Sequence, residues 1–222
     1  MNAVVLELLK ASLLTLGALF PIVNPLGNAP IFLSLTRGYS SATRGWLARR
    51  VALNGFVLLL VSLLIGTHIL AFFGISLPVV QVGGGMVVIA TGWSLLQRKD
   101  EDTASHDGER SASAIDLSQR AFYPLTLPLT VGPGSISVAI TLGANWGDSS
   151  HFHWMPLAAA VLGSALLGLT IYLSYRFAET IARILGDTAM SVILRLSSFI
   201  LLCIGVQILW NGVSTLLRGV IR

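Results

Sequence analysis

Charged side chains are scarce in this chain of 222 residues, at 11% of the total, whereas hydrophobic residues make up 54%. An average soluble domain is about 25% charged, and a soluble surface needs that charge to stay dissolved. The composition therefore excludes a soluble enzyme, a nucleic-acid-binding protein and a disordered chain. It predicts an integral membrane protein that lies in a lipid bilayer.

Cysteine is also nearly absent. Because Cys203 is the single cysteine, no intrachain disulfide can form, and the clustered Cys and His ligands of a zinc or iron–sulfur site are missing from the sequence. His151 and His153 lie close together without a further clustered ligand, so we expect no metal and no other cofactor. The apolar segments contain no cluster of His, Asp, Glu or Cys residues that could serve in catalysis. We therefore predict that the protein is not an enzyme.

Five intervals of the sequence contain no charged residue. They run from Lys10 to Arg37, Arg50 to Arg98, Arg120 to Asp148, Asp148 to Arg176 and Arg195 to Arg218. A helix needs about 20 apolar residues to cross the hydrocarbon of a bilayer, and the second interval is long enough for two crossings with a turn at residues 73–78. We predict an all-α polytopic protein with six spans, at residues 4–34, 51–73, 77–97, 121–144, 155–175 and 192–216.

Basic residues gather on one side of the predicted membrane. Eleven of the 14 Lys and Arg residues fall in the segments 37–50, 98–120 and 176–195. Because cytoplasmic loops are enriched in Lys and Arg, both termini are predicted to be extracytoplasmic. Residues 98–120 are predicted to be a flexible cytoplasmic linker between a first three-helix repeat, residues 1–97, and a second one, residues 121–222.

An odd number of spans in each half means that the second half enters the membrane from the opposite side. Inverted repeats of this kind build many secondary transporters, which bind substrate at the midplane where broken helices meet. The first and fourth predicted helices carry matching interruptions: Pro21 aligns with Pro128, and Gly27 aligns with Gly134. In lipid such a break survives only where it lines a cavity or is buried in protein. The sequence therefore predicts that these two helices are discontinuous.

The residues that follow the two glycines, Asn28 and Ser135, are predicted to be helix N-caps. An exposed helix N-terminus favours a carboxylate and an exposed C-terminus favours a cation, so a zwitterion suits a site made from both. Prolines that only kink packed helices are the alternative interpretation. Because the charge-free intervals offer no carboxylate, a coupling ion would depend on carbonyls, hydroxyls, amides or the charge of the substrate.

A weaker correspondence links the third and sixth predicted helices. Gly84 and Gly85 are followed by Gly92, and Ser197 and Ser198 are followed by Gly205 at the same spacing. Small residues let helix backbones approach closely. We expect these positions to seat the broken helices against their neighbours.

These segments carry a resemblance to the MarC family of inner-membrane proteins, over nearly the whole chain. The matching segments are Asn24–Pro30, Leu127–Gly134, Gly74–Pro78 followed by Gly83–Gly85, and Gly205–Gly212. The resemblance implies a multi-pass protein with six spans in the inner membrane of a bacterium or archaeon. The family includes transporters of small neutral amino acids resembling glycine and alanine, in which the discontinuous helices 1 and 4 form the site.

Carried over to this chain, the resemblance implies a transporter of small neutral amino acids. We expect a secondary transporter that works by alternating access at the two breaks, with a small zwitterion as substrate and H⁺ or Na⁺ as the candidate coupling ion. The substrate-binding residues that it singles out are Asn24, Pro25, Leu26, Gly27, Asn28, Thr130, Val131, Gly132, Pro133, Gly134 and Ser135. Two alternatives stay open: an exporter of small metabolites or drugs with the same architecture, and a non-transporting membrane scaffold. The sequence does not indicate an oligomeric state.

Overall fold

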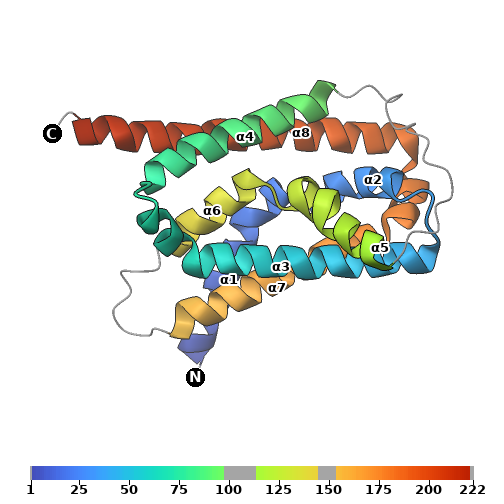
Figure 1. The fold of residues 1–222 in the computed structure, drawn as a ribbon, viewed down its shortest axis with the longest axis horizontal. Coiled ribbons are helices and arrows are strands. Elements are labelled where there is room, and N and C mark those ends of the chain that lie inside the picture. The colour runs from blue at the N-terminus through green and yellow to red at the C-terminus, as the bar shows by residue number, and fades with distance from the viewer. Residues whose placement is uncertain (1, 98–113, 145–153, 221–222) are drawn as a thin grey trace.

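The computed structural model describes residues 2–97, 114–144 and 154–220, and every element within these ranges is a helix (Figure 1). The all-α prediction is confirmed for this part of the chain. The elements in chain order are α1 (Asn2–Val23), α2 (Pro25–Leu35), α3 (Ser41–Phe72), α4 (Leu77–Gln97), α5 (Ala114–Arg120), η1 (Ala121–Thr130), α6 (Pro133–Ala144), α7 (Trp154–Arg176) and α8 (Ala178–Val220).

Five of the described helices are long and apolar enough to cross a membrane. They are Val4–Val23, Ser41–Phe72, Leu77–Gln97, Trp154–Arg176 and Ser191–Gly219. The bent pair Ile115–Thr130 and Pro133–Ala144 makes a sixth if it is counted as one span. The start of α1 and the end of α8 lie toward the same end of the molecule, and α3 and α8 begin at the opposite end (Figure 1).

Helix boundaries differ from the prediction mainly outside the apolar segments. The bounds of α4 agree, but α3 starts at Ser41, ten residues before the predicted start, because the Ser40 hydroxyl caps it by accepting from the Thr43 amide at 3.2 Å. Of the predicted linker, residues 98–113 lie outside the described residues and Ala114–Arg120 are helical. Helix α8 begins at Ala178 and changes direction at Gly186, where φ is 70°.

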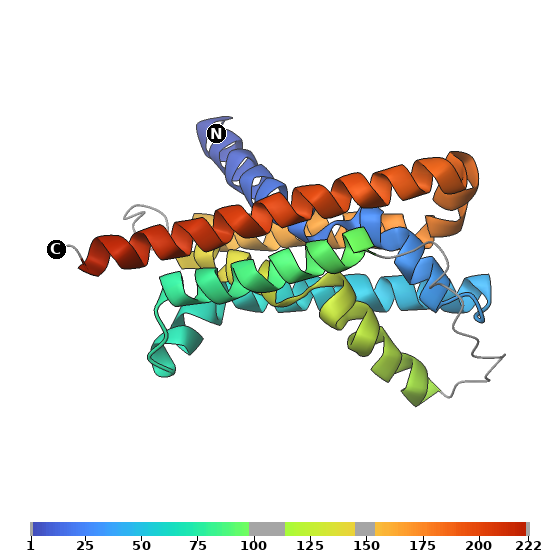
Figure 2. The ribbon, with the colours of Figure 1, turned by 90° about the horizontal axis from the view of Figure 1, so that it is seen from above.

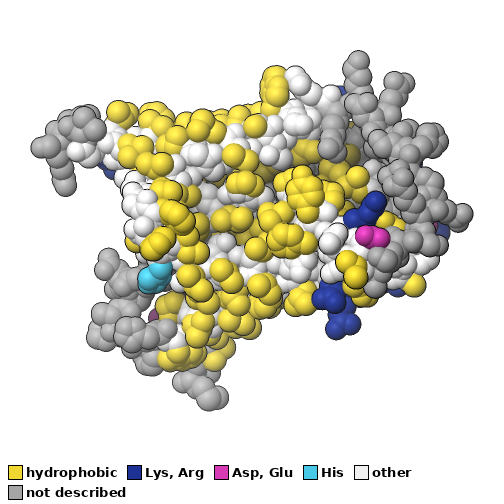
Figure 3. Space-filling model, viewed as in Figure 1, with side chains coloured by type: hydrophobic (Ala, Val, Ile, Leu, Met, Phe, Trp, Pro, Cys, Tyr) yellow, Lys and Arg dark blue, Asp and Glu magenta, His cyan; other side chains and the backbone are white. Residues whose placement is uncertain are grey.

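The surface is apolar where a bilayer would contact it. Phe72 is 84% exposed and Leu14 is 72% exposed, and hydrophobic side chains cover the middle of the face shown in Figure 3. The Arg, Asp and Glu side chains that are prominent on this face gather at one end (Figure 3). Arg44 of α3 and Glu179 of α8 form an ion pair of 2.7 Å. The described surface therefore has an apolar band with a charged end.

Helices α4 and α8 pack side by side with their chains running in opposite directions (Figure 2). A methyl group added at Gly85 would lie 2.6 Å from the Leu209 nitrogen and 2.9 Å from the Gly205 oxygen. One added at Gly205 would lie 2.7 Å from the Ile89 nitrogen and 3.1 Å from the Gly85 oxygen. The contact is reciprocal and brings the two backbones together, which only glycine allows.

Close backbone contacts of the same kind occur on either side of the Gly85–Gly205 contact, toward both ends of the α4–α8 pair. Gly92 lies against the Leu202 nitrogen, and Gly212 lies against the Val82 nitrogen, each 2.9 Å from where a methyl group would stand. The expectation that small residues of these helices seat the interrupted helices is confirmed at Gly84, which lies against Ser137 of α6. It is wrong at Gly85, Gly92 and Gly205, which seat α4 and α8 on each other.

Candidate functional site

The first interruption lies between α1 and α2, at Asn24. This residue has φ 46° and ψ 59°, the left-handed region that asparagine tolerates better than most residues. Its side-chain oxygen accepts from the Gly27 amide at 3.1 Å, and its carbonyl accepts from the Asn28 amide at 3.0 Å. Pro25 then occupies the first helical position, where its missing N–H costs nothing. The N-cap of α2 is therefore Asn24, and the prediction of Asn28 as the cap is wrong.

The second interruption lies between η1 and α6, where the segments Ile115–Thr130 and Pro133–Ala144 are bent by 70°. Tyr123 and Leu127 have extended backbone angles because each precedes a proline, which disfavours the helical region. Helix α6 begins at Pro133, so Ser135 lies in its first turn and donates its hydroxyl to the Gly132 carbonyl at 2.9 Å. Ser135 is therefore not the N-cap, contrary to the prediction. A helix start leaves its first amides without an intrahelical acceptor.

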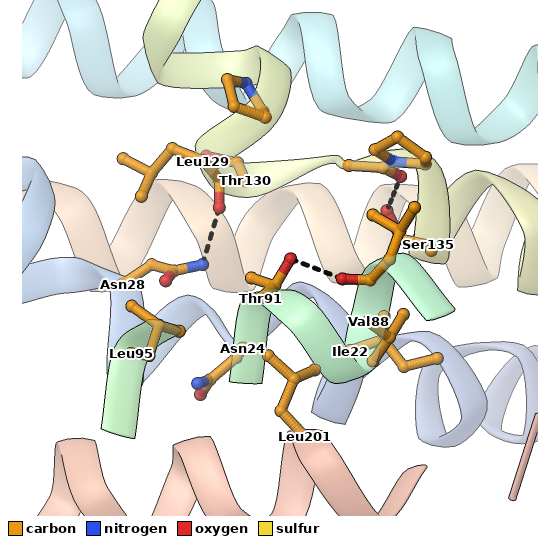
Figure 4. A pocket seen from close by; sticks show the side chains of 15 residues that line it. Ile22, Asn24, Asn28, Val88, Thr91, Leu95, Leu129, Thr130, Ser135 and Leu201 are labelled. Atoms are coloured by element: carbon orange, nitrogen blue, oxygen red, sulfur yellow. Dashed lines mark hydrogen bonds between the residues drawn. The ribbon is translucent and has the colours of Figure 1, made fainter. Parts of the chain in front are cut away.

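One carboxamide bridges the two interruptions. The Asn28 side chain is 6% exposed and donates to the Val23 carbonyl and to the Leu129 carbonyl, both at 2.9 Å. Val23 ends α1 and Leu129 lies in the last turn of η1, so both carbonyl oxygens belong to helix C-terminal ends at the interruptions. Figure 4 shows the amide directed at η1 across the intervening space. The residues of the two interruptions are thus held together in space, although 101 positions separate Asn28 and Leu129 in the sequence.

A cavity of about 90 Å³ lies between the two interruptions. A cavity of about 10–15 Å³ is enough for one water molecule, so this cavity admits several waters or a small organic molecule. None of the residues that line it is charged. They are Ile22, Asn24, Asn28, Val87, Val88, Thr91, Leu95, Pro128, Leu129, Thr130, Gly132, Pro133, Gly134, Ser135 and Leu201.

Seven of the eleven residues singled out from the sequence line this cavity, namely Asn24, Asn28, Thr130, Gly132, Pro133, Gly134 and Ser135. The other four do not. Pro25 and Gly27 are buried, with Gly27 directly beneath the Asn24 side chain, and Leu26 is 48% exposed on the surface. Val131 is fully buried and faces Gly55 of α3.

The sequence did not point to the wall formed by α4. Val88, Thr91 and Leu95 follow Gly84 by four, seven and eleven residues, a spacing that places all of them on one helix face. Gly134 packs directly against Val88, where a side chain of any size would collide. That spacing is the signal that could have identified this wall once Gly84 was known to face α6.

Several polar groups of the cavity retain unused hydrogen-bonding capacity. The hydroxyls of Thr91 and Ser135 donate to the Val87 and Gly132 carbonyls, at 2.8 and 2.9 Å, which leaves their oxygen lone pairs as acceptors. Asn24 uses its side-chain oxygen on the Gly27 amide, so its amide nitrogen stays a donor. The site thus presents both donors and acceptors in an otherwise apolar lining.

Unlike these cavity residues, Thr130 also contacts a side-chain hydroxyl of α7. Its own hydroxyl donates to the Leu125 carbonyl at 2.7 Å and lies 2.8 Å from the Tyr175 hydroxyl. The Tyr175 ring stacks on Phe32 of α2 with centroids 4.5 Å apart and an interplanar angle of 13°. This contact chain connects α2, α7 and η1 behind the cavity.

Comparison with known proteins gives one consistent relationship. A family model described as MarC family integral membrane protein matches residues 9–217. The UPF0056 membrane protein YvbG of Bacillus subtilis is 31% identical over 197 residues, which cover 89% of this chain and 91% of that protein. The UPF0056 inner membrane protein MarC of Escherichia coli is 30% identical over 217 residues, 96% and 98% of the two chains. No solved structure matches.

Proposed function

This chain belongs to the MarC family of integral membrane proteins, and from that premise we propose that it is a secondary transporter of small neutral amino acids resembling glycine and alanine, not an enzyme. One observation carries the proposal. Two helical segments are interrupted at Asn24 and at Val131–Gly132, and both interruptions open onto one cavity that the Asn28 carboxamide spans. In a membrane, irregular backbone of this kind is tolerated where it lines a cavity.

The polar groups of the cavity suit a zwitterion. The first turn of α6, at Gly134 and Ser135, presents backbone amides at a helix N-terminus, which favours a carboxylate. The lone pairs of the Thr91 and Ser135 hydroxyls can accept from an ammonium group. The first interruption is less suited to hold the carboxylate, because Asn24 already binds the amides of Gly27 and Asn28. Thr130 is likewise engaged, by Leu125 and Tyr175.

The size of the cavity favours a substrate with a very short side chain. Its volume of about 90 Å³ is confined by Val88 and Leu95 of α4 and by Leu201 of α8. A coupling ion, H⁺ or Na⁺, would be bound by carbonyl and hydroxyl oxygens or carried through the substrate's own charge, because the lining is uncharged.

Reciprocal packing of α4 on α8 supports an arrangement of two three-helix repeats with opposite topology, residues 1–97 and 121–222. Gly85 corresponds to Gly205, and Gly92 to Gly212, with the same offset of 120 residues. The sequence pattern instead paired Gly85 with Ser198, which is an offset of 113 residues. This offset is seven residues shorter than the offset of 120 in the structure. Seven residues are two helical turns, so the two registers present the same face. A two-fold axis in the membrane plane relates antiparallel helices in this way.

The other helix contacts agree with such an axis. Helix α3 packs on α7, which is its counterpart in the second repeat. Under the same rotation the pair α1 with α7 exchanges with the pair η1 with α3, and the pair α2 with α7 exchanges with the pair α6 with α3. Alternating access would then proceed by rocking of one repeat against the other around the cavity. With the arginine-rich end of the molecule in the cytoplasm, both termini would face outward.

Counterflow of radiolabelled glycine and alanine in proteoliposomes, with and without ion gradients, tests the proposal. We expect saturable exchange for the wild type and none for Gly134→Leu, because the added side chain would collide with Val88 and displace the cavity wall. Gly17→Leu is the matched control, since no atom lies within 4 Å of a side chain added at Gly17. Normal exchange by Gly134→Leu would remove the site assignment.

The exporter and the scaffold alternatives are tested with the same preparation. Exchange of other small metabolites or drugs, with none for glycine or alanine, would favour the exporter. Absence of exchange across a broad panel of amino acids and metabolites, with the protein folded and inserted, would favour a membrane scaffold.

A further inference from the structure

Helix α8 carries polar side chains on the side that faces away from α4. Gln207 and Asn211 are both exposed, and the Gln207 amide nitrogen donates to the Asn211 side-chain oxygen at 2.9 Å. Cys203, one turn earlier, is also exposed. The opposite side of the helix holds Gly205 and Gly212, which contact α4. The polar side of α8 therefore lies at the surface of the chain.

The depth of Gln207 makes this placement unusual. It lies 12 residues after Arg195 and 11 before Arg218, or about 18 and about 17 Å at 1.5 Å per residue. The hydrocarbon is about 30 Å thick, which puts Gln207 within a few ångströms of its centre. The packing gives the same depth independently. Gln207 falls between the Gly205 and Leu209 contacts with α4, and these contacts are made at Ile89 and Gly85, near the middle of Leu77–Gln97.

Lipid cannot satisfy the carboxamides at this depth. A carboxamide has two N–H donors and an acceptor oxygen, and the bond between Gln207 and Asn211 uses one donor and one acceptor. Within the part of the chain that the structure describes, the second Gln207 donor, the Gln207 oxygen and both Asn211 donors have no partner. Hydrogen-bonding groups without a partner are costly in hydrocarbon. A polar group from outside the chain would therefore lower the free energy of this surface.

The exposed residues of α8 recur at the spacing of a helix-pairing seam. In steps of four and three, the seam consists of Leu196, Ile200, Cys203, Gln207, Trp210, Ser214 and Leu217. All of them are exposed except Ser214, which is half-buried. Alternating steps of three and four are the pattern by which two helices pack with a left-handed crossing, and most helix pairs in membranes cross in this way.

We propose that this seam pairs with the same seam of a second copy of the chain, around a two-fold axis along the membrane normal. All copies insert with the same orientation, so the two α8 helices run parallel and each seam position meets itself. A carboxamide is its own hydrogen-bonding complement, and Gln207 of each copy donates to Gln207 of the other. No charged residue lies between Arg195 and Arg218, so no charge repulsion within the seam opposes self-association. The pairing does not depend on whether the chain transports a substrate.

The single native cysteine tests the pairing in the full-length chain in its membrane. Oxidation with copper–phenanthroline and oxygen should join two Cys203 thiols into a disulfide and give a reducible band at twice the mass of 23.6 kDa. Trp210→Cys in a Cys203→Ser background should give the same band, because position 210 lies seven residues along the same seam. Leu169→Cys in that background is the control, since Leu169 is 51% exposed on α7, outside the seam.

Three results would overturn the proposal. The first is equal cross-linking at positions 203 and 169, which would mean random collision. The second is an adduct of another mass, which would identify a different protein as the occupant. The third is no adduct at either seam position, with single fluorophores bleaching in one step in liposomes, which would mean that lipid covers the seam.

A substitution at Gln207 tests the hydrogen bond that is proposed at the centre of the seam. Interhelical polar contacts in membranes contribute amounts that correspond to about a 3- to 20-fold change in association. We expect Gln207→Leu to weaken dimerisation by about that factor, measured by energy transfer between labelled copies as the lipid-to-protein ratio rises. Gln207→Asn should recover part of it, whereas Val61→Ala on the exposed side of α3 should have no effect. Unchanged dimerisation in Gln207→Leu would contradict the proposed contact.

Discussion

Replacing Asn28 by leucine should separate the two interruptions while keeping the branching and the number of heavy atoms of the side chain. The Asn28 amide donates to the Val23 and Leu129 carbonyls, both at 2.9 Å, in a setting where the residue is 6% exposed. A buried group left without its hydrogen bond costs about 1–3 kcal/mol. Two carbonyls lose their donor in Asn28→Leu, so the expected loss of stability is about 2–6 kcal/mol.

Thermal unfolding in detergent, with transport measured in proteoliposomes, gives the magnitude. For chains of this length about 1 kcal/mol lowers Tm by about 2–4 °C, so Asn28→Leu should unfold at least about 4 °C below the wild type and lose most of its transport. Asn28→Asp should be no better, because a carboxylate replaces the donor with an acceptor that faces two carbonyl oxygens.

Asn54→Leu is the control for this prediction. The Asn54 amide makes one long hydrogen bond, 3.4 Å to the Thr126 hydroxyl, so its loss should cost less than the loss of Asn28. If Asn28→Leu unfolds within about 1 °C of the wild type and still exchanges substrate, the inference that this carboxamide holds the two interruptions together is refuted. A larger loss in Asn54→Leu than in Asn28→Leu would have the same consequence.

Two further predictions concern contacts around the site. Tyr175→Phe keeps the stacked ring but loses the hydroxyl contact, so it should cost about 0.5–1.5 kcal/mol, and Tyr175→Leu should cost more because the stack is also lost; equal Tm values for the two variants would contradict a role for stacking. Arg44→Glu places like charges beside Glu179, which is 65% exposed. Such surface pairs contribute about 0–1 kcal/mol, so Tm should fall slightly at low salt, recover at high salt, and recover at low salt when Glu179→Arg is added.

The extent of the membrane spans could be predicted from the sequence because hydropathy reports directly on the bilayer. Helix α4 has the predicted bounds, since Gly74 with φ 67° ends the preceding turn and Arg98 ends the apolar segment. The first ten residues of α3 were missed for the same reason. They include Arg44, Arg49 and Arg50, which hydropathy assigns to the aqueous phase. A capped helix can nevertheless continue through these residues beyond the membrane.

The two interruptions could be located from their prolines and glycines, but the cap could not be identified. Asparagine is a favourable N-cap at position 24 and at position 28 alike. The choice depends on Pro25, which fits the first position of a helix and so places the cap one residue before it. Asn28 is then inside the helix, where its amide reaches the other interruption, a contact that no local rule reveals.

The apolar walls of the cavity could not be predicted, because Val88, Leu95 and Leu201 are ordinary residues in apolar helices. Their place at the cavity follows from two packing events, the close approach of α4 to α8 and the contact of Gly134 with Val88. Both depend on the distance between helices that are far apart in the sequence. Such distances are fixed by the whole set of contacts and not by any segment alone.

At the two interruptions, many backbone N–H and C=O groups that have lost their helical hydrogen bonds form hydrogen bonds with side chains of the interruptions themselves. Asn24 binds two amides of α2, Asn28 binds two carbonyls, and the Thr126 and Thr130 hydroxyls bind the Ala121 and Leu125 carbonyls. A carrier must pass through an empty state in each cycle, and a site whose backbone depended wholly on substrate for its hydrogen bonds would be strongly destabilised when empty. Under the proposed function, a substrate would form hydrogen bonds only with the few groups that remain free, and its release would be correspondingly easy. The same groups that keep the empty site folded would therefore limit how tightly the site could hold a substrate.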